Sequence, residues 1–126
     1  MKPSLLALIP VFAACGPSGD PLPGRPGITW MSEVACVDEA RVKTAFDLSL
    51  DALGDYSPWT RERIAHDVAP CLIQIKAGLV IETATGSAVG LAFGAEGRVQ
   101  VVQSLRNLAH DLLHIVVYRH TGVIDL

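Results

Sequence analysis

The chain has 126 residues, of which ten are lysine or arginine, thirteen are aspartate or glutamate and four are histidine, so its net charge is −3 at pH 7. An acidic chain without a basic patch lacks the charge distribution of a nucleic-acid-binding protein. Hydrophobic residues make up 50% of the sequence, which at this length allows one domain with a single core.

The first fourteen residues have the pattern of a targeting signal and are not expected to belong to the folded domain. Lys2 precedes an apolar run over residues 5–14. This run is too short to span a bilayer as a helix of the mature protein. We therefore interpret residues 1–14 as a signal peptide.

The end of this segment resembles the lipobox of bacterial lipoproteins. Ala13 and Ala14 directly precede Cys15, although Phe12 occupies a position that is usually leucine. The resemblance implies cleavage before Cys15, acylation of this residue and stable anchoring in a lipid bilayer. Because Gly16 follows, rather than the aspartate that favours retention in the inner membrane, the resemblance implies an outer-membrane location in the cell envelope. The alternative is an ordinary secretory signal beside a coincidental cysteine.

Residues 15–27 are expected to form a flexible tether behind the lipidated cysteine. Four prolines and several glycines occupy this segment, which contains almost no apolar residues. Such a composition cannot build a core. The folded domain is therefore predicted to span residues 28–126.

The other two cysteines, Cys36 and Cys71, form an even pair once the lipid-bearing Cys15 is set aside. In an oxidising compartment such a pair predicts a disulfide bond. A bond that closes a loop of this length would stabilise the fold by about 4 kcal/mol in the chain-entropy description. Metal binding by the same pair is less favoured, because the close CxxC spacing of structural zinc sites is missing.

The first strong element of the domain is an amphipathic helix. From Asp38 onward, apolar residues recur at intervals of three and four between Val42 and Leu53, and Gly54 follows them. One face of this helix should pack on the core. Its charged residues are interpreted as the solvated face.

A second, shorter helix is predicted after Ser57 and Pro58, which are typical of an N-cap and a first helical residue. It should end before Pro70, because a residue that precedes proline favours extended geometry. His66 lies in this segment among charged residues. We interpret it as a surface histidine, the alternative being a distant metal ligand.

Beyond Pro70 the pattern changes to short β-branched and apolar runs separated by glycine-containing turns, which predicts three or four strands. These runs cover residues 72–75, 79–81, 88–93 and 98–102, and residues 28–30 are a candidate for one more short strand. In the last run Val99 and Val101 alternate with Arg98 and Gln100, so one face of that strand should lie on the core.

The last predicted helix runs from Ser104, as its N-cap, to Gly122, as its C-terminal stop. Apolar residues cover most of its circumference, which predicts burial nearly all round. A helix of this kind would cover a mainly antiparallel sheet, together with the N-terminal helix. The sequence therefore predicts an α+β domain.

This helix carries the only chemically distinctive motif in the sequence, His110-Asp111-Leu112-Leu113-His114. Histidines four residues apart project from one face of a helix and can reach the same tetrahedral Zn²⁺. The motif resembles the HExxH signature of the zincin metallopeptidases, with aspartate in place of glutamate. The resemblance implies that His110 and His114 bind zinc and that Asp111 is the general base for peptide hydrolysis.

The motif departs from the family pattern at Asp111, whose side chain is one methylene shorter than glutamate. Its carboxylate would fall short by about a bond length, and a misplacement of about 1 Å can lower a rate a hundredfold. The alternative interpretation of the motif is a chance HxxxH pair, in which each histidine is a hydrogen-bonded core residue and not a metal ligand. The competing hypothesis for the whole chain is a catalytically inactive or truncated zincin-like lipoprotein with a binding or structural role.

The third zinc ligand is the least defined part of this hypothesis. His120 has the spacing of the third histidine in the metzincin pattern, but Val117 replaces the glycine that breaks that helix. If the helix continues to Gly122, His120 points away from the other two histidines. Asp125 is then the better candidate, because a carboxylate is an acceptable zinc ligand.

Overall fold

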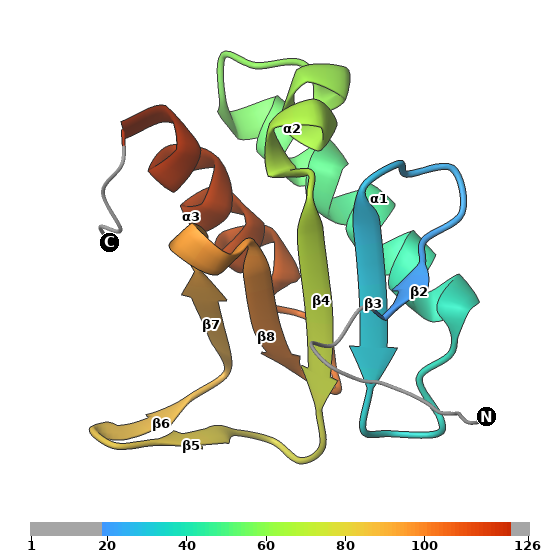
Figure 1. Ribbon diagram of the computed structural model, residues 1–126, viewed down its shortest axis with the longest axis vertical. Helices are drawn as coiled ribbons and strands as arrows, with labels where there is room; N and C mark the ends of the chain where they lie inside the picture. Colours follow the sequence, from blue (N-terminus) through green and yellow to red (C-terminus); the bar gives the residue numbers. More distant parts are fainter. Residues whose placement is uncertain (1–18, 122–126) are drawn as a thin grey trace, which may run out of the picture.

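The computed structural model of this protein describes residues 19–121, which form a mixed β-sheet, three α-helices and a two-stranded arm (Figure 1). The elements are β2 Asp20–Pro21, β3 Ile28–Ser32, α1 Glu39–Tyr56, α2 Arg61–Val68, β4 Cys71–Lys76, β5 Ile81–Thr83, β6 Gly86–Ala88, β7 Gly90–Phe93, the 3₁₀-helix η2 Gly94–Glu96, β8 Arg98–Val102 and α3 Leu108–Thr121. None of the helices within the described range combines the length and hydrophobicity needed to cross a bilayer.

The sheet has the strand order β2-β3-β4-β8-β7, and β5 pairs with β6 to form the arm. The central strands β3, β4 and β8 are parallel to one another, whereas β2 and β7 run antiparallel to their neighbours. Parallel neighbours require a crossover connection, and α1 and α2 supply it between β3 and β4. The predicted α+β class is confirmed, but the sheet is mixed, with a parallel centre that the prediction of a mainly antiparallel sheet did not include.

One face of the sheet carries the core. Along β4, Cys71, Ile73 and Ile75 are buried, and Figure 1 shows α1 and α3 on the side behind the sheet. The opposite face is polar: the side-chain oxygen of Gln74 accepts hydrogen bonds from Arg98 at 3.0 Å and from Gln100 at 3.2 Å. The alternation therefore follows the two-residue period of a strand that is covered by helices on one side.

Both predicted N-terminal helices form, with shifted boundaries. The carboxylate of Asp38 caps α1 by accepting the backbone N–H of Arg41 at 2.9 Å, as expected for an N-cap. The helix continues through Gly54 to Tyr56, and Ser57 is its C-cap. Ser57 therefore cannot start the next helix, and Thr60 caps α2 instead.

The last helix starts later than predicted. Leu105 adopts a left-handed backbone conformation with φ 63°, which is incompatible with a helix that continues from Ser104. The helix α3 therefore begins at Leu108. The helix is also not buried all round: Leu112 lies in the core, whereas His110 and Leu113 are exposed. The sequence pattern overestimated its burial because Leu113, although it lines a small cavity with Leu53 and Trp59, stays 36% exposed.

The part of the predicted tether that the structure describes, residues 19–27, is folded onto the domain. Leu22 is buried, and the guanidinium of Arg25 forms an ion pair with Asp47 of α1 at 2.8 Å. The pairing of β2 with β3 and the backbone hydrogen bond from Cys71 to Gly27 fix the same segment, although its composition favoured flexibility. The signal peptide and Cys15 lie outside the described residues.

The predicted disulfide bond is wrong, because Cys36 and Cys71 are both free thiols. Cys71 starts β4 and pairs with Ile28, the first residue of β3, whereas Cys36 comes four residues after the end of β3 and shares a groove with Val102, the last residue of β8. The length of β3 alone separates them by about 13 Å at about 3.3 Å per residue. Two Cα atoms must lie within about 7 Å for a disulfide bond.

The core position of Phe46 gives a test of this packing. Phe46 is fully buried, so we expect Phe46→Ala to lower the free energy of unfolding by about 3–5 kcal/mol. The exposed Leu48 lies two residues further along the same helix, and Leu48→Ala should change stability by less than about 0.5 kcal/mol. Urea denaturation of the three proteins measures both effects, and equal losses would contradict the assignment of the buried face.

Candidate metal centre

The two histidines of the last helix point at each other. His110 and His114 lie one turn apart on α3, and their Nε2 atoms are 2.9 Å apart. The rings meet edge to face, with centroids 4.6 Å apart and planes at 79°. Both imidazoles therefore direct the same nitrogen toward one point beside the helix, at the surface of the domain.

This geometry fits two of the four ligand positions of a zinc ion. Zn–N bonds of about 2.05 Å in a tetrahedron place two nitrogens about 3.3 Å apart, close to the spacing of the two Nε2 atoms. In a hydrogen bond between the two rings, one Nε2 carries the proton and the other accepts it. A metal bound to both Nε2 atoms would displace that proton, which a neutral ring can carry on Nδ1 instead.

Asp111, the residue after His110, is buried against the sheet beside Gly90 of β7. Its side chain is only 2% exposed; Oδ1 accepts a hydrogen bond from Nδ2 of Asn107 at 3.1 Å, and Oδ2 has no hydrogen-bond partner in the described structure. Burial raises the pKa of Asp111 to about 7, against the opposing effect of the Asn107 hydrogen bond. At neutral pH this carboxyl group can therefore both hold and release a proton.

The edge strand β7 packs directly on this carboxylate. A Cβ atom at Gly90 would lie 2.5 Å from Nδ2 of Asn107 and still closer to Oδ2 of Asp111. Only glycine fits this position, because real Cβ atoms do not approach other atoms so closely. The acid of the motif is thus fixed between α3 and the outermost strand of the sheet.

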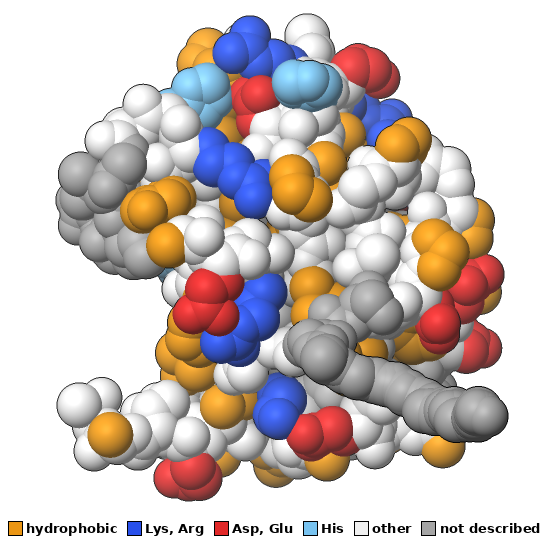
Figure 2. Space-filling model, viewed as in Figure 1, with side chains coloured by type: hydrophobic (Ala, Val, Ile, Leu, Met, Phe, Trp, Pro, Cys, Tyr) orange, Lys and Arg blue, Asp and Glu red, His pale blue; other side chains and the backbone are white. Residues whose placement is uncertain are grey.

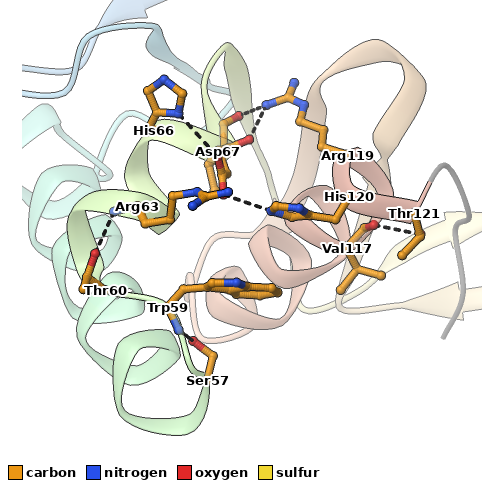
Figure 3. Close-up of polar contacts among 11 residues, drawn as sticks. Ser57, Trp59, Thr60, Arg63, His66, Asp67, Val117, Arg119, His120 and Thr121 are labelled. Carbon is orange, nitrogen blue, oxygen red and sulfur yellow. Dashed lines mark hydrogen bonds and ion pairs between the residues drawn. The ribbon is translucent and has the colours of Figure 1, made fainter.

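His120 lies elsewhere. Its Nε2 contacts Oδ2 of Asp67 at 3.0 Å, and its ring stacks on Trp59 with centroids 5.1 Å apart and planes at 9° (Figure 3). It therefore does not join His110 and His114. Asp125, the other candidate for the third ligand, lies outside the described residues.

No group of three or more His, Cys, Asp or Glu side chains suited to a metal ion occurs within residues 19–121. The described part of the chain thus brings the two histidines together and buries the acid of the motif against β7. It does not supply a third protein ligand beside them.

A second polar cluster, which the sequence did not reveal, joins α2 to the end of α3. The carboxylate of Asp67 is contacted by Arg63 at 2.9 Å and His66 at 3.3 Å in addition to His120. Figure 2 shows histidine, basic and acidic side chains gathered at the end of the molecule where α2 lies. Burial alone would raise the pKa of Asp67, but the hydrogen bonds from His120, His66 and Arg63 outweigh it and lower the pKa.

Arg119 completes this connection from the neighbouring position of α3. Its guanidinium donates hydrogen bonds to the backbone carbonyls of Asp67, Val68 and Pro70. It therefore satisfies carbonyl groups at the end of α2 that have no partner within that helix. Only the Arg63–Asp67 spacing of four residues was a signal in the sequence, because the partners on α3 are about fifty residues away.

Comparison with known proteins adds no assignment: no family model, no curated protein and no solved structure matches this chain. The site must be judged from its own geometry.

The close contact between β7 and the acid leads to a double-mutant test. Gly90→Ala should lower the free energy of unfolding by about 1–3 kcal/mol, because the methyl group enters the space of the Asp111 carboxylate. Combining it with Asp111→Ala should recover a large part of this loss. Gly54→Ala, in a helix where a Cβ meets only ordinary contacts, should instead stabilise by about 0.5–1 kcal/mol. Additive effects at positions 90 and 111 in thermal or urea unfolding would contradict the contact.

Proposed function

We propose that the chain is a membrane-anchored, zinc-dependent metallopeptidase-like lipoprotein in which His110 and His114 bind Zn²⁺. The observation that carries the proposal is the convergence of their Nε2 atoms, 2.9 Å apart, on a helix that packs against an edge strand. The sequence resemblance to the zincin signature supports the same assignment. The substrate class is a peptide or protein, and an acidic chain does not favour nucleic acid.

The chemistry of the proposal divides between the metal and Asp111. Zinc, when bound, supplies a water of lowered pKa, about 7, and polarises a peptide carbonyl. Asp111 accepts the proton of the attacking water, and its raised pKa of about 7 makes it a better base than an exposed carboxylate. Asn107 and Gly90 hold its carboxylate in one place, against β7.

The proposal assigns the third ligand to Asp125. The midpoint between His110 and His114 lies about nine residues before Thr121 along α3, which corresponds to about 13 Å at 1.5 Å per residue. Four residues lead from Thr121 to Asp125 and can span at most about 14 Å. On this estimate Asp125 is at the limit of reach of the two histidines.

The proposed anchor is the acylated Cys15, which would hold the protein in the outer membrane of the cell envelope. Cys15 lies four residues before Gly19, the first described residue, and the chain between them can span at most about 14 Å. Because the segment from Gly19 is folded onto the domain, the domain would lie close to the bilayer. A long flexible spacer is not part of this arrangement.

The second candidate function is a catalytically inactive zincin-like lipoprotein with a binding or structural role. It is favoured by the burial of Asp111, whose carboxylate contacts Gly90 and Asn107 and is almost inaccessible to solvent. The side chain is also shorter than the glutamate of the zincin signature. In this case the two histidines could still bind metal without turnover.

Zinc binding tests the first proposal. The full chain, purified without chelator, should hold one zinc ion per molecule, and His110→Ala combined with His114→Ala should weaken zinc binding by about a hundredfold or more. Competition with a chromophoric chelator measures the affinity. His66→Ala is the matched control, because His66 is highly exposed and belongs to the Asp67 cluster. Equal zinc binding by the double variant would exclude this site.

The acid at position 111 separates the two candidate functions. Asp111→Glu should raise peptidase activity about a hundredfold if the shorter carboxylate limits the reaction, whereas Asp111→Asn should abolish it. Cleavage of a quenched fluorescent casein by zinc-loaded protein provides the measurement. Zinc binding without activity in either the wild type or the glutamate variant would support the inactive lipoprotein.

A further inference from the structure

Two arginine side chains stand apart from the other cations of the domain. Within residues 19–121, six of the nine lysine and arginine side chains form ion pairs with carboxylates, and Arg119 binds backbone carbonyls. The other two, Arg41 on α1 and Arg106 before α3, have no carboxylate partner in this range and are exposed. Within residues 19–121, two positive charges thus have no carboxylate partner, although the chain as a whole is negatively charged.

Both arginines line the same pair of adjoining surface grooves. The first groove, of about 610 Å³, follows α1 past Ala45, Leu48 and Ala52. The second, of about 500 Å³, follows the end of β8 past Leu79 and Val80. Arg41 and Arg106 belong to the lining of each groove and so lie where the two meet.

Exposed apolar side chains accompany the two arginines. Leu48 is 62% exposed, Leu79 83% and Val80 44%, and these are three of the six large hydrophobic side chains exposed in the described structure. We define the strand-end patch as Arg41, Leu48, Leu79, Val80 and Arg106. It extends to the end of the molecule where β3, β4 and β8 finish and the β5–β6 arm begins, at the bottom of Figure 1. Such a combination of exposed leucines and unpaired arginines requires a partner that is both apolar and anionic.

We propose that the strand-end patch rests on a bilayer surface that contains anionic phospholipids. Its leucines and valine enter the boundary between headgroups and acyl chains, and the two guanidinium groups bind lipid phosphates. This inference rests on the proposed anchor at Cys15, because an anchor four residues before Gly19 keeps the domain within about 14 Å of the bilayer. Some face of the domain must then meet the membrane.

The distribution of charge favours the strand-end patch as the face that meets the membrane. Elsewhere in the described domain the cations are already bound by carboxylates or carbonyls, so those surfaces attract anionic lipid weakly. Asp38 and Glu39 begin α1 one turn before the patch, but neither lines either groove. Each unpaired basic side chain near an anionic surface strengthens binding about fivefold, so the pair is expected to contribute about 25-fold.

The exposed Cys36 lines the second groove and provides a reporter for the test. Cys71 is buried and burial raises its pKa to about 12, so it should not react with a maleimide. The full chain, labelled at Cys36 with an environment-sensitive dye, is mixed with phosphatidylcholine vesicles with or without phosphatidylglycerol. A Cys36→Ser protein treated in parallel gives the background from any other thiol.

The expected result is a blue shift of the dye emission that requires phosphatidylglycerol. Arg41→Gln combined with Arg106→Gln should raise the phosphatidylglycerol content needed for the shift, with about 25-fold weaker contact at fixed composition. Arg61→Gln, which removes an exposed arginine that is paired with Asp51, should leave the shift unchanged. An equal loss in the Arg61 variant would overturn the proposal, because net charge and not the patch would then control the contact.

Flotation of the same samples separates this inference from the anchor on which it rests. Protein that floats with pure phosphatidylcholine vesicles but shows no shift at any composition would keep the anchor and overturn the patch. A shift on phosphatidylglycerol vesicles without flotation on phosphatidylcholine would support the patch and refute the anchor. A shift that grows with protein concentration in the absence of vesicles would identify a second copy as the occupant and overturn the proposal.

Discussion

The close packing of α3 on β7 and η2 is the constraint on which the candidate site depends. A Cβ at Gly90 would collide with Asp111 and Asn107, and a Cβ at Gly94 would lie 2.6 Å from the ring of Tyr118. Two glycines therefore let the helix approach the edge of the sheet more closely than any other residues would allow. This approach buries Asp111 and turns His110 and His114 away from the sheet, so one contact determines the orientation of all three side chains.

The energetic consequences of this packing differ for the acid and the histidines. Burying a carboxylate with one unsatisfied oxygen is unfavourable, and the raised pKa of Asp111 expresses that cost. The cluster of Asp67, His120 and Arg119 holds the other end of α3 against α2. A helix fixed at both ends can keep a costly group in place, and groups of this kind are concentrated at functional sites.

The proposed metal centre and the strand-end patch are neighbours on the chain. Arg106 lies four residues before His110, and α3 starts at the end of the sheet where β8 finishes. A domain that rests on the bilayer through this patch would hold the two histidines near the membrane surface. In the proposed arrangement the anchor would supply proximity, the two arginines would supply orientation, and the orientation would determine which peptides reach α3.

The sequence by itself determined those features that depend on neighbours along the chain. The alternation over residues 98–102 predicted β8 with its observed bounds, the apolar spacing predicted α1, and the four-residue spacing placed His110 and His114 on one face, because helix and strand periods are local properties. Tertiary structure decided the rest. Parallel pairing of β3 and β4 separates Cys36 from Cys71, packing of residues 19–27 replaces a tether, and His120 finds its partner on α2. Each of these features depends on contacts between segments that are distant in the sequence. The local sequence pattern around a residue does not determine which distant segment packs against it.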